Sequence, residues 1–217
     1  MMKVLVIGAN GKTAIRVVRL LRDGPHEPVA MIRHSEQRQT FDAMGVPTVL
    51  GDLEYPIDHA VAGCDAVIFA AGSGSKTGKD KTVLVDHLGG IRAAVTAHVH
   101  GARRFIMLSG LNADVNSQSR IMHYHRAKAH ADNFLRGHHE VLPGDPLEYT
   151  IVCPGGLTEQ PSTGHCHISS ELHGEGRTSR ELVPEVLVAC LDRPNTIGKS
   201  FSLLDGETPI EQALSTV

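Results

Sequence analysis

Short apolar runs alternate with longer amphipathic segments along the whole chain, and this alternation constrains the fold more than any other feature. Apolar runs rich in β-branched residues are typical of strands buried on both faces of a parallel sheet. We expect such strands at residues 4–7, 28–32, 47–50, 66–70, 105–108, 149–153 and 200–204. Strands that alternate with helices predict one α/β domain over residues 1–217, a doubly wound parallel Rossmann sheet with helices on both faces.

The segments between these strands carry the spacing of helices. The clearest is an apolar stripe whose members recur every three or four residues, which is typical of a helix that packs on a core. The stripe consists of Leu84, Leu88, Ile91, Val95 and Val99. Further helices are expected at residues 36–44, 120–136, 179–191 and 209–214, with Ser179 as a cap. Residues 157–178 show no periodicity, and we expect a flexible flap there, within a small substrate-side segment at about 155–217.

The first expected strand runs directly into the sequence Gly8-Ala9-Asn10-Gly11-Lys12-Thr13-Ala14. This is a G-x-x-G-x-x-A loop between a strand and a helix, the context in which such a loop binds a dinucleotide. The first glycine permits a tight turn, the second lets the backbone approach a diphosphate, and the alanine lets the helix pack on the sheet. The N–H groups at the helix start, with the loop residues Asn10, Lys12 and Thr13, are then available to phosphate. We predict a dinucleotide site here; the alternative is an ordinary turn between a strand and a helix.

The end of the second strand bears on the choice between NAD and NADP. NAD sites normally place an acidic residue there for the ribose 2′-hydroxyl, but this chain has Ile32-Arg33-His34-Ser35. A guanidinium pairs well with a phosphate, so Arg33 favours NADP, and Arg38 and Lys12 can add charge. The alternative is that Arg33 is a solvated surface residue. Asp52, after the third strand, is either a contact to adenine or a simple turn acid.

Several short motifs give the chain a resemblance to a known family. They are Gly8-Ala9-Asn10-Gly11, Gly51-Asp52-Leu53, Ala70-Ala71-Gly72, Arg104-Phe105-Ile106-Met107-Leu108-Ser109, Tyr124-His125-Arg126-Ala127-Lys128 and Tyr149-Thr150-Ile151-Val152-Cys153-Pro154-Gly155-Gly156. Over nearly its whole length the chain resembles the atypical short-chain dehydrogenase/reductase family, and more narrowly its bacterial NAD(P)-dependent epimerase/dehydratase group. The resemblance implies a Rossmann fold with NAD(P) as cofactor. It also implies cofactor contacts from Leu53, Ala70, Ala71, Gly72, Lys128, Pro154 and Gly156.

The same resemblance implies a set of catalytic residues. The wider family uses a Tyr-x-x-x-Lys pair with an upstream Ser or Thr, and Tyr124 and Lys128 match the pair. Spacing of four residues puts both on one face of a helix. A nearby ammonium favours the tyrosinate, so we expect Lys128 to lower the pKa of Tyr124 and to hydrogen-bond the nicotinamide ribose. The third catalytic position falls on Ser109 or, one residue later, on Gly110, in which case Asn112 could donate instead.

Cysteine and histidine give no strong sign of a metal site. The four cysteines form no C-x-x-C pair, which suggests free thiols in a reducing cytoplasm, and Cys153 stands where relatives commonly have arginine. Histidines two residues apart on a helix point to nearly opposite sides, so we interpret His123 and His125 as exposed helix residues. The alternative is that these two histidines, which flank Tyr124, tune the pocket or act as acid–base groups. Only the sequence His165-Cys166-His167, in an expected loop, could share a metal, and we expect none.

Composition limits the partners of the chain. The 217 residues carry a formal net charge of -3 and are 41% hydrophobic, which argues against the basic face of a nucleic-acid binder. No apolar run reaches membrane-spanning length. We therefore expect a cytoplasmic protein with a small-molecule substrate and neither nucleic acid nor membrane as a partner. The resemblance to the family implies a monomer or a homodimer.

Three functions remain open from the sequence. The first is an NADP-dependent oxidoreductase that acts on a small carbonyl or alcohol. The second is an epimerase or dehydratase that uses bound NADP transiently, although the C-terminal segment is short for a nucleotide-sugar substrate. The third is a redox sensor that binds NADP(H) without turnover, which an incomplete catalytic set would suit.

Overall fold

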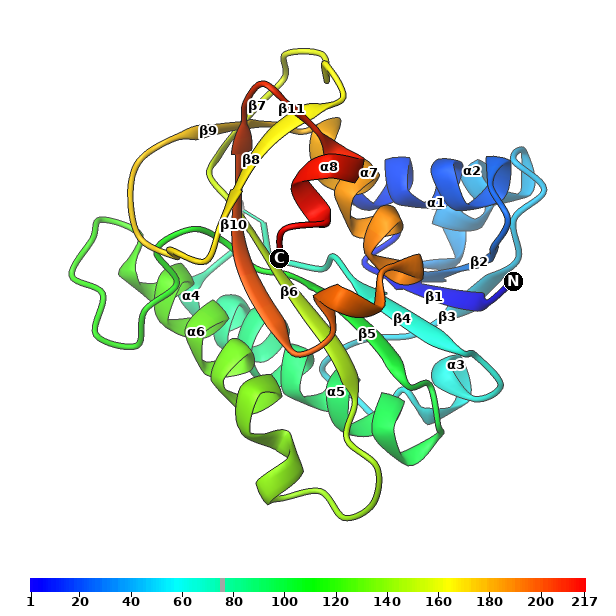
Figure 1. Cartoon of the computed structure of the whole chain (residues 1–217). Coiled ribbons are helices and arrows are strands. Elements are labelled where there is room, and N and C mark those ends of the chain that lie inside the picture. The colour runs from blue at the N-terminus through cyan, green and yellow to red at the C-terminus, as the bar shows by residue number, and fades with distance from the viewer. Residues whose placement is uncertain (75–76) are drawn as a thin grey trace.

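One nine-stranded sheet forms the centre of the computed structural model, which describes residues 1–74 and 77–217 (Figure 1). The strand order is β11-β8-β10-β6-β5-β4-β1-β2-β3. The parallel part comprises β1 (Lys3–Ile7), β2 (Glu27–Ile32), β3 (Thr48–Leu50), β4 (Ala66–Phe69), β5 (Arg104–Leu108), β6 (Glu148–Pro154) and β10 (Lys199–Asp205). Two further strands, β8 (His165–Ser169) and β11 (Thr208–Pro209), extend the sheet in antiparallel pairs. The predicted strands are confirmed, and the sheet is longer than predicted.

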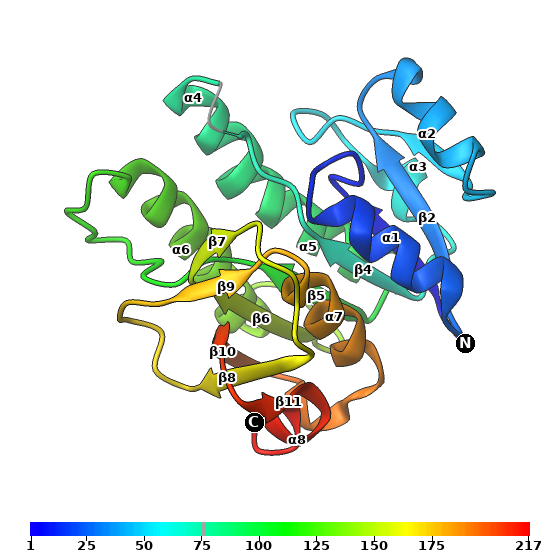
Figure 2. The same cartoon turned by 90° about the horizontal axis from the view of Figure 1, so that it is seen from above.

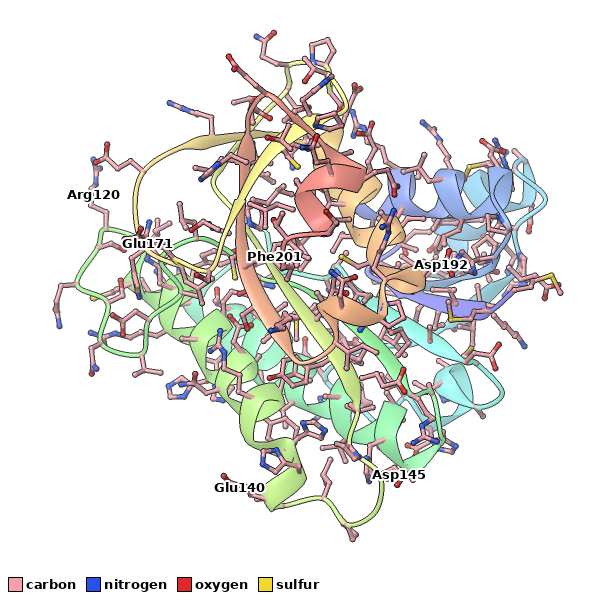
Figure 3. The ribbon with its side chains drawn as sticks, in the orientation of Figure 1. Arg120, Glu140, Asp145, Glu171, Asp192 and Phe201 are labelled. Atoms are coloured by element: carbon pink, nitrogen blue, oxygen red, sulfur yellow. The ribbon has the colours of Figure 1, made fainter. Side chains whose placement is uncertain are left out.

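Helices cover both faces of this sheet, because the strands are apolar on both sides. In β1, Val4 and Val6 face one core cluster and Leu5 and Ile7 face the other, as the two-residue period of a strand requires. One face carries α1 (Ala14–Asp23), α2 (Arg38–Asp42), α7 (Leu182–Ala189) and α8 (Ile210–Leu214); the other carries α3 (Asp58–Val61), α5 (Gly89–Val99) and α6 (Met122–Gly137) (Figure 1). The predicted doubly wound Rossmann architecture is therefore confirmed. Phe201 on β10 is fully buried on the α7 face (Figure 3).

The long helix after β4 is present, but its predicted buried face is wrong. The helix starts as α4 (Lys79–Lys81), continues as a π-helical segment over Thr82–Leu88, here called the π segment, and becomes α5. The residues on its sheet side are small: Gly89, Gly90, Ala93, Ala94 and Ala97. The predicted apolar stripe lies outside both core clusters, with Val99 66% exposed. These buried glycines and alanines also recur at helical spacing, so the prediction chose the face with the larger apolar residues, which is not the face that packs on the sheet.

Residues 157–178, predicted to be a structureless flap, contain strands. β7 (Gly156–Thr158) pairs with β9 (Arg177–Ser179) beside the main sheet, and β8 joins the main sheet itself (Figure 2). Only Cys166 and Ile168 of β8 pack against the core, between histidines and a serine. Two apolar residues are too few to produce a recognisable period, which is why the sequence did not reveal the strand.

The predicted cap of α7 is wrong, because Glu181 holds the N-cap position, without a side-chain cap hydrogen bond, and β9 ends at Ser179. The hydroxyl oxygen of Ser179 accepts the N–H of Glu181, and α7 begins at Leu182. Within the described part of the chain, no helix combines the length and the apolar character that crossing a membrane requires.

Candidate functional site

A pocket of about 730 Å³ opens at the carboxyl ends of β4, β5 and β6. In open α/β sheets this edge is where ligands bind. Its walls include residues that follow the three strands, one face of α6, and the segment Gly174–Arg177. Among the lining residues are Ala70, Ala71, Gly72, Asp86, Ser109, Gly110, Tyr124, Lys128, Pro154 and Gly156. The pocket therefore collects residues that are far apart in the sequence, including most of those predicted for the nicotinamide end of a cofactor.

The glycine loop contacts the wall of this pocket. Gly8 has a φ of +83°, a conformation that side chains disfavour. A Cβ added at Gly8 would lie 2.6 Å from the Cα of Ala71. Only glycine therefore lets the loop after β1 approach the segment after β4 so closely. Next in the loop, Gly11 donates its N–H to the carbonyl of Gly8 at 2.8 Å, which closes the tight turn predicted from the sequence.

The loop has the properties that a diphosphate requires. Within residues 1–74 and 77–217, the amides of Asn10, Lys12 and Thr13 donate to no protein acceptor. They precede α1, a helix of 10 residues whose N-terminus carries a positive partial charge. Gly11 is exposed, so nothing covers the backbone at this point. Free amides, an exposed glycine and a helix N-terminus together fit a dinucleotide diphosphate.

Arg180 also reaches the glycine loop, although no sequence motif predicts this contact. Its Nη1 lies 3.4 Å from the Oγ1 of Thr13, while its Nε donates to Glu159 at 2.9 Å. Glu159 in turn lies 3.8 Å from the ammonium of Lys12. Two cations and one carboxylate thus lie beside the free amides, although Arg180 follows β9 and is 167 residues from Thr13.

Arg33, Asp52 and Leu53, which were predicted to contact the adenosine end of the cofactor, have different surroundings. Arg33 follows β2, is exposed, and donates its Nε to His34 at 3.0 Å; it pairs with no carboxylate of the described residues. Asp52 accepts the N–H of Glu54 at 3.0 Å, so it does form a local turn. Leu53 is 6% exposed and belongs to the core cluster beneath α5.

Tyr124 and Lys128 lie four residues apart on α6, and both line the pocket as predicted. The Nζ of Lys128 is 5.8 Å from the centre of the Tyr124 ring. Lys128 is 3% exposed and forms an ion pair with Asp86, which is 1% exposed, at 3.3 Å. The sequence analysis did not identify Asp86, because no motif marks it and its partner is 42 residues away.

Lys128 does act to lower the pKa of Tyr124, as predicted, but the net pKa is raised and not lowered. Burial raises the pKa of Tyr124 above its ordinary value, and the nearby ammonium of Lys128 only partly opposes this effect. Carboxylates at Asp86 and Asp132 add to the rise. Burial lowers the pKa of Lys128, but the attraction of Asp86, the Tyr124 phenol and Asp132 outweighs it, so the net pKa is raised. The phenol and the ammonium therefore both hold their protons firmly.

Ser109 and Gly110, the two candidates for the third catalytic position, have different surroundings in the structure. Ser109 is 2% exposed and donates its hydroxyl to the Oδ2 of Asp132 at 2.5 Å. A Cβ added at Gly110 would lie 3.4 Å from the Tyr124 Oη. The residue that faces the phenol is thus Gly110, which has no side chain. Ser109 lines the pocket, but its hydroxyl proton is held by Asp132, a residue that the sequence analysis missed.

Asn112 joins two segments of the pocket wall through hydrogen bonds to Gly174. Its backbone has a φ of +65°. Its side-chain amide donates to the carbonyl of Gly174 at 2.8 Å and accepts the N–H of Gly174 at 3.0 Å. These bonds join the loop before α6 to the loop after β8. Both loops lie on the side of the molecule where Figure 3 labels Arg120 and Glu171.

Two expectations about histidines are also corrected. His125 is 8% exposed, lines the pocket, and has its Nδ1 3.1 Å from the hydroxyls of Ser117 and Ser119. It is therefore a pocket residue and not an exposed helix residue. His165 and His167 lie on β8 and not in a loop. Among the described residues, no three His, Cys, Asp or Glu side chains are grouped as metal ligands.

Comparisons with known proteins find one family and several similar chains. Residues 8–194 match the NAD(P)H-binding family. The chain is 42% identical to the uncharacterized sugar epimerase YhfK of Bacillus subtilis, over 98% of this chain and 99% of that protein. A Bacillus halodurans structure classed as an NAD-dependent epimerase/dehydratase is 39% identical, with a TM-score of 0.91 over the whole of both chains. The oxidoreductase ylbE of Lactococcus lactis is 26% identical, with a TM-score of 0.83 over 100% of this chain and 96% of that one.

Proposed function

The chain belongs to the NAD(P)H-binding family, of the atypical short-chain dehydrogenase/reductase type, and we propose that it is an NADP-dependent oxidoreductase acting on a small carbonyl or alcohol. The observation that carries the proposal is the position of Tyr124 and Lys128 in the pocket beside the glycine loop. A proton donor at the carboxyl edge of a Rossmann sheet is suited to hydride-transfer chemistry. The Lactococcus relative, which is named an oxidoreductase, supports the same reaction class.

In this proposal the cofactor lies along the carboxyl edge of the sheet. The amides of Asn10, Lys12 and Thr13 hold the diphosphate at the N-terminus of α1, and Arg180 adds a guanidinium from across the loop. Arg33 binds the 2′-phosphate, because no acidic residue stands at the end of β2. The remaining proposed contacts are Gly8 and Gly11 in the loop, Asp52 and Leu53 near adenine, and Ala70, Ala71, Gly72, Lys128, Pro154 and Gly156 at the nicotinamide end.

The chemistry needs one proton besides the hydride that NADPH supplies. Tyr124 is placed to give that proton, because its phenol lines the pocket. As the phenolic O–H bond breaks, a new O–H bond forms on the substrate oxygen, and the phenolate then recovers a proton from solvent. The ammonium of Lys128 beside the ring stabilises the negative charge that the transfer leaves on Tyr124.

Turnover of NADPH tests this function. Purified protein is mixed with NADPH and a panel of quinones, flavins and aldehydes, and the loss of NADPH absorbance is followed. We expect turnover that falls by about 100-fold or more in Tyr124→Phe, the usual size of a lost acid–base group. The control is Tyr55→Phe, because Tyr55 is 67% exposed and lies outside the pocket. Equal turnover in the two variants would contradict the role of Tyr124.

A second candidate is a sensor that binds NADP(H) without turnover. The observation that favours it is the third catalytic position, where Gly110 faces the phenol and the Ser109 hydroxyl is bound to Asp132. Tight NADPH binding, no turnover with any acceptor, and unchanged binding in Tyr124→Phe would select the sensor.

The names of two relatives favour a third candidate, an epimerase or dehydratase. Such an enzyme returns the cofactor to its starting redox state in every cycle. It would therefore convert substrate with no net loss of NADPH absorbance, whereas an oxidoreductase consumes one NADPH for each substrate molecule.

A further inference from the structure

Asp86 is a buried carboxylate in the wall of the pocket that also holds Tyr124 and Lys128. It lies on the π segment, and its Oδ2 accepts the N–H of Ser73 at 2.9 Å. A Cβ added at Gly72 would lie 3.1 Å from the Asp86 Oδ1, so the glycine leaves room for the carboxylate. The backbone thus fixes this side chain from two sides, next to the ammonium of Lys128. Turns of π-helix are frequent at functional sites.

Three oxygen atoms of the protein surround the Lys128 ammonium. Its Nζ donates hydrogen bonds to the carbonyl oxygens of Ala71 at 3.3 Å and Leu108 at 3.2 Å. It also lies 3.3 Å from the Asp86 Oδ1, with which it forms an ion pair. The position of Lys128 beside the Tyr124 ring is therefore set by Asp86 and two backbone carbonyls, without any ligand.

Opposite charges lie near the Tyr124 phenol. Lys128 contributes one positive charge from α6, and Asp86 on the π segment contributes one negative charge. Burial, together with Asp86, Asp132 and the thiol of Cys153, raises the pKa of the phenol against the effect of Lys128. The other titratable groups that face the pocket are His125 on α6 and Glu175 and Arg177 at its mouth. A free ammonium would favour the phenolate, but this one is compensated.

We propose that Asp86 is a positioning residue of this site: by holding Lys128 and compensating its charge, it keeps Tyr124 a neutral phenol that gives its proton to the substrate. This inference rests on the proposed oxidoreductase function, and it assigns the direction of the reaction that the site favours. At neutral pH the site is set for reduction of a carbonyl, which needs the phenol. Oxidation of an alcohol needs the phenolate and is held back until the pH rises.

Titration of Tyr124 in the protein without cofactor tests the role of Asp86. The chain has three tyrosines and no tryptophan, so phenolate absorbance can be followed without an indole background. Subtracting the curve of Tyr124→Phe isolates the titration of Tyr124. We expect Asp86→Asn to lower the midpoint of that titration by about 1 pH unit or more, a tenfold change in the acid dissociation constant. Asp80→Asn, an exposed position on the same long helix, is the matched control and should leave the midpoint unchanged.

A second pair of variants covers the case in which Asp86→Asn does not fold, and its double variant removes both buried charges together. The single variant Asp86→Asn buries an ammonium without its counter-ion, which destabilises a protein strongly. Lys128→Met, compared with the double variant Asp86→Asn/Lys128→Met, removes the same carboxylate in the absence of the ammonium. The double variant should titrate at lower pH than Lys128→Met. Equal midpoints in this pair, or in the wild type and a folded Asp86→Asn, overturn the proposal.

NADPH binding to the same variants separates this inference from the proposed function. A lowered Tyr124 midpoint with no NADPH binding rejects the oxidoreductase function and keeps the electrostatic role of Asp86. NADPH binding with an unshifted midpoint rejects the role of Asp86 alone. In turnover, Asp86→Asn should raise alcohol oxidation relative to carbonyl reduction at neutral pH, and an unchanged ratio would contradict the assigned direction.

Discussion

Asp132→Asn is the perturbation whose effect follows most directly from the structure. Asp132 lies on α6, is 1% exposed, and accepts one hydrogen bond, from the hydroxyl of Ser109. Its other oxygen, Oδ1, has no hydrogen-bond partner among the described residues. Burial raises the pKa of Asp132 to about 6, and the Ser109 bond and the charges of Arg136 and Lys128 only partly offset that rise. The ionised carboxylate of Asp132 thus lowers the stability of the folded state.

The pH window and the size of this cost follow from linkage. The unfolded chain releases the Asp132 proton near pH 3.8, whereas the folded chain keeps it until about pH 6. Between these values the folded state binds more protons than the unfolded state, so its stability falls as pH rises. At about 1.4 kcal/mol per pH unit, the loss over this window is about 3 kcal/mol. Asparagine does not ionise, so the free energy of unfolding of Asp132→Asn should not fall in this way over the same pH window.

Urea unfolding, followed by far-ultraviolet circular dichroism at several pH values between about 4 and 7, measures the effect. The informative quantity is the free energy of unfolding of Asp132→Asn minus that of the wild type, because the other carboxylates cancel in this difference. It should rise by about 3 kcal/mol in favour of the variant across the window. Asp145→Asn, at a highly exposed carboxylate, is the control and should show no such rise. A difference that stays flat or falls with pH would refute the assignment.

Three further predictions concern arginines. Arg33→Ala should weaken the binding of NADP much more than that of NAD in calorimetric titrations; equal losses would remove the assignment of NADP. Arg180→Ala should weaken both cofactors about tenfold, because the guanidinium at Thr13 lies at the proposed diphosphate site; unchanged affinities would exclude it from the site. Arg104→Ala should lower the free energy of unfolding by about 3 kcal/mol, because four buried oxygen acceptors lose their donor. Arg103→Ala, at a solvent-exposed ion pair, is the control for Arg104 and should change little.

The sequence was sufficient for the parts of the fold that depend on local pattern. The strand after Met2, the glycine loop and the helix after it were predicted because each leaves a signal within a few residues. The pairing of Tyr124 with Lys128 on one helix face was predictable for the same reason. The antiparallel strands at the edge of the sheet were not, because β8 has only Cys166 and Ile168 on its buried side.

The electrostatics of the site could not be predicted, because they depend on residues brought together by the tertiary structure. Asp86 and Lys128 are 42 residues apart, and the π segment that turns Asp86 inward has no sequence signature. The position of Gly110 opposite the phenol depends on the register of a single residue at the end of β5. A one-residue shift there exchanges a serine for a glycine, which is why pattern alone left the third position open.

Calorimetric titration of the purified wild-type protein with NADPH, and separately with NADH, tests the central proposal most directly. Free amides at the glycine loop and an exposed arginine at the end of β2 predict that NADPH binds in the micromolar range or tighter, and more tightly than NADH. If neither nucleotide binds at millimolar concentration, this chain does not use the site as proposed, whatever the fold of its relatives.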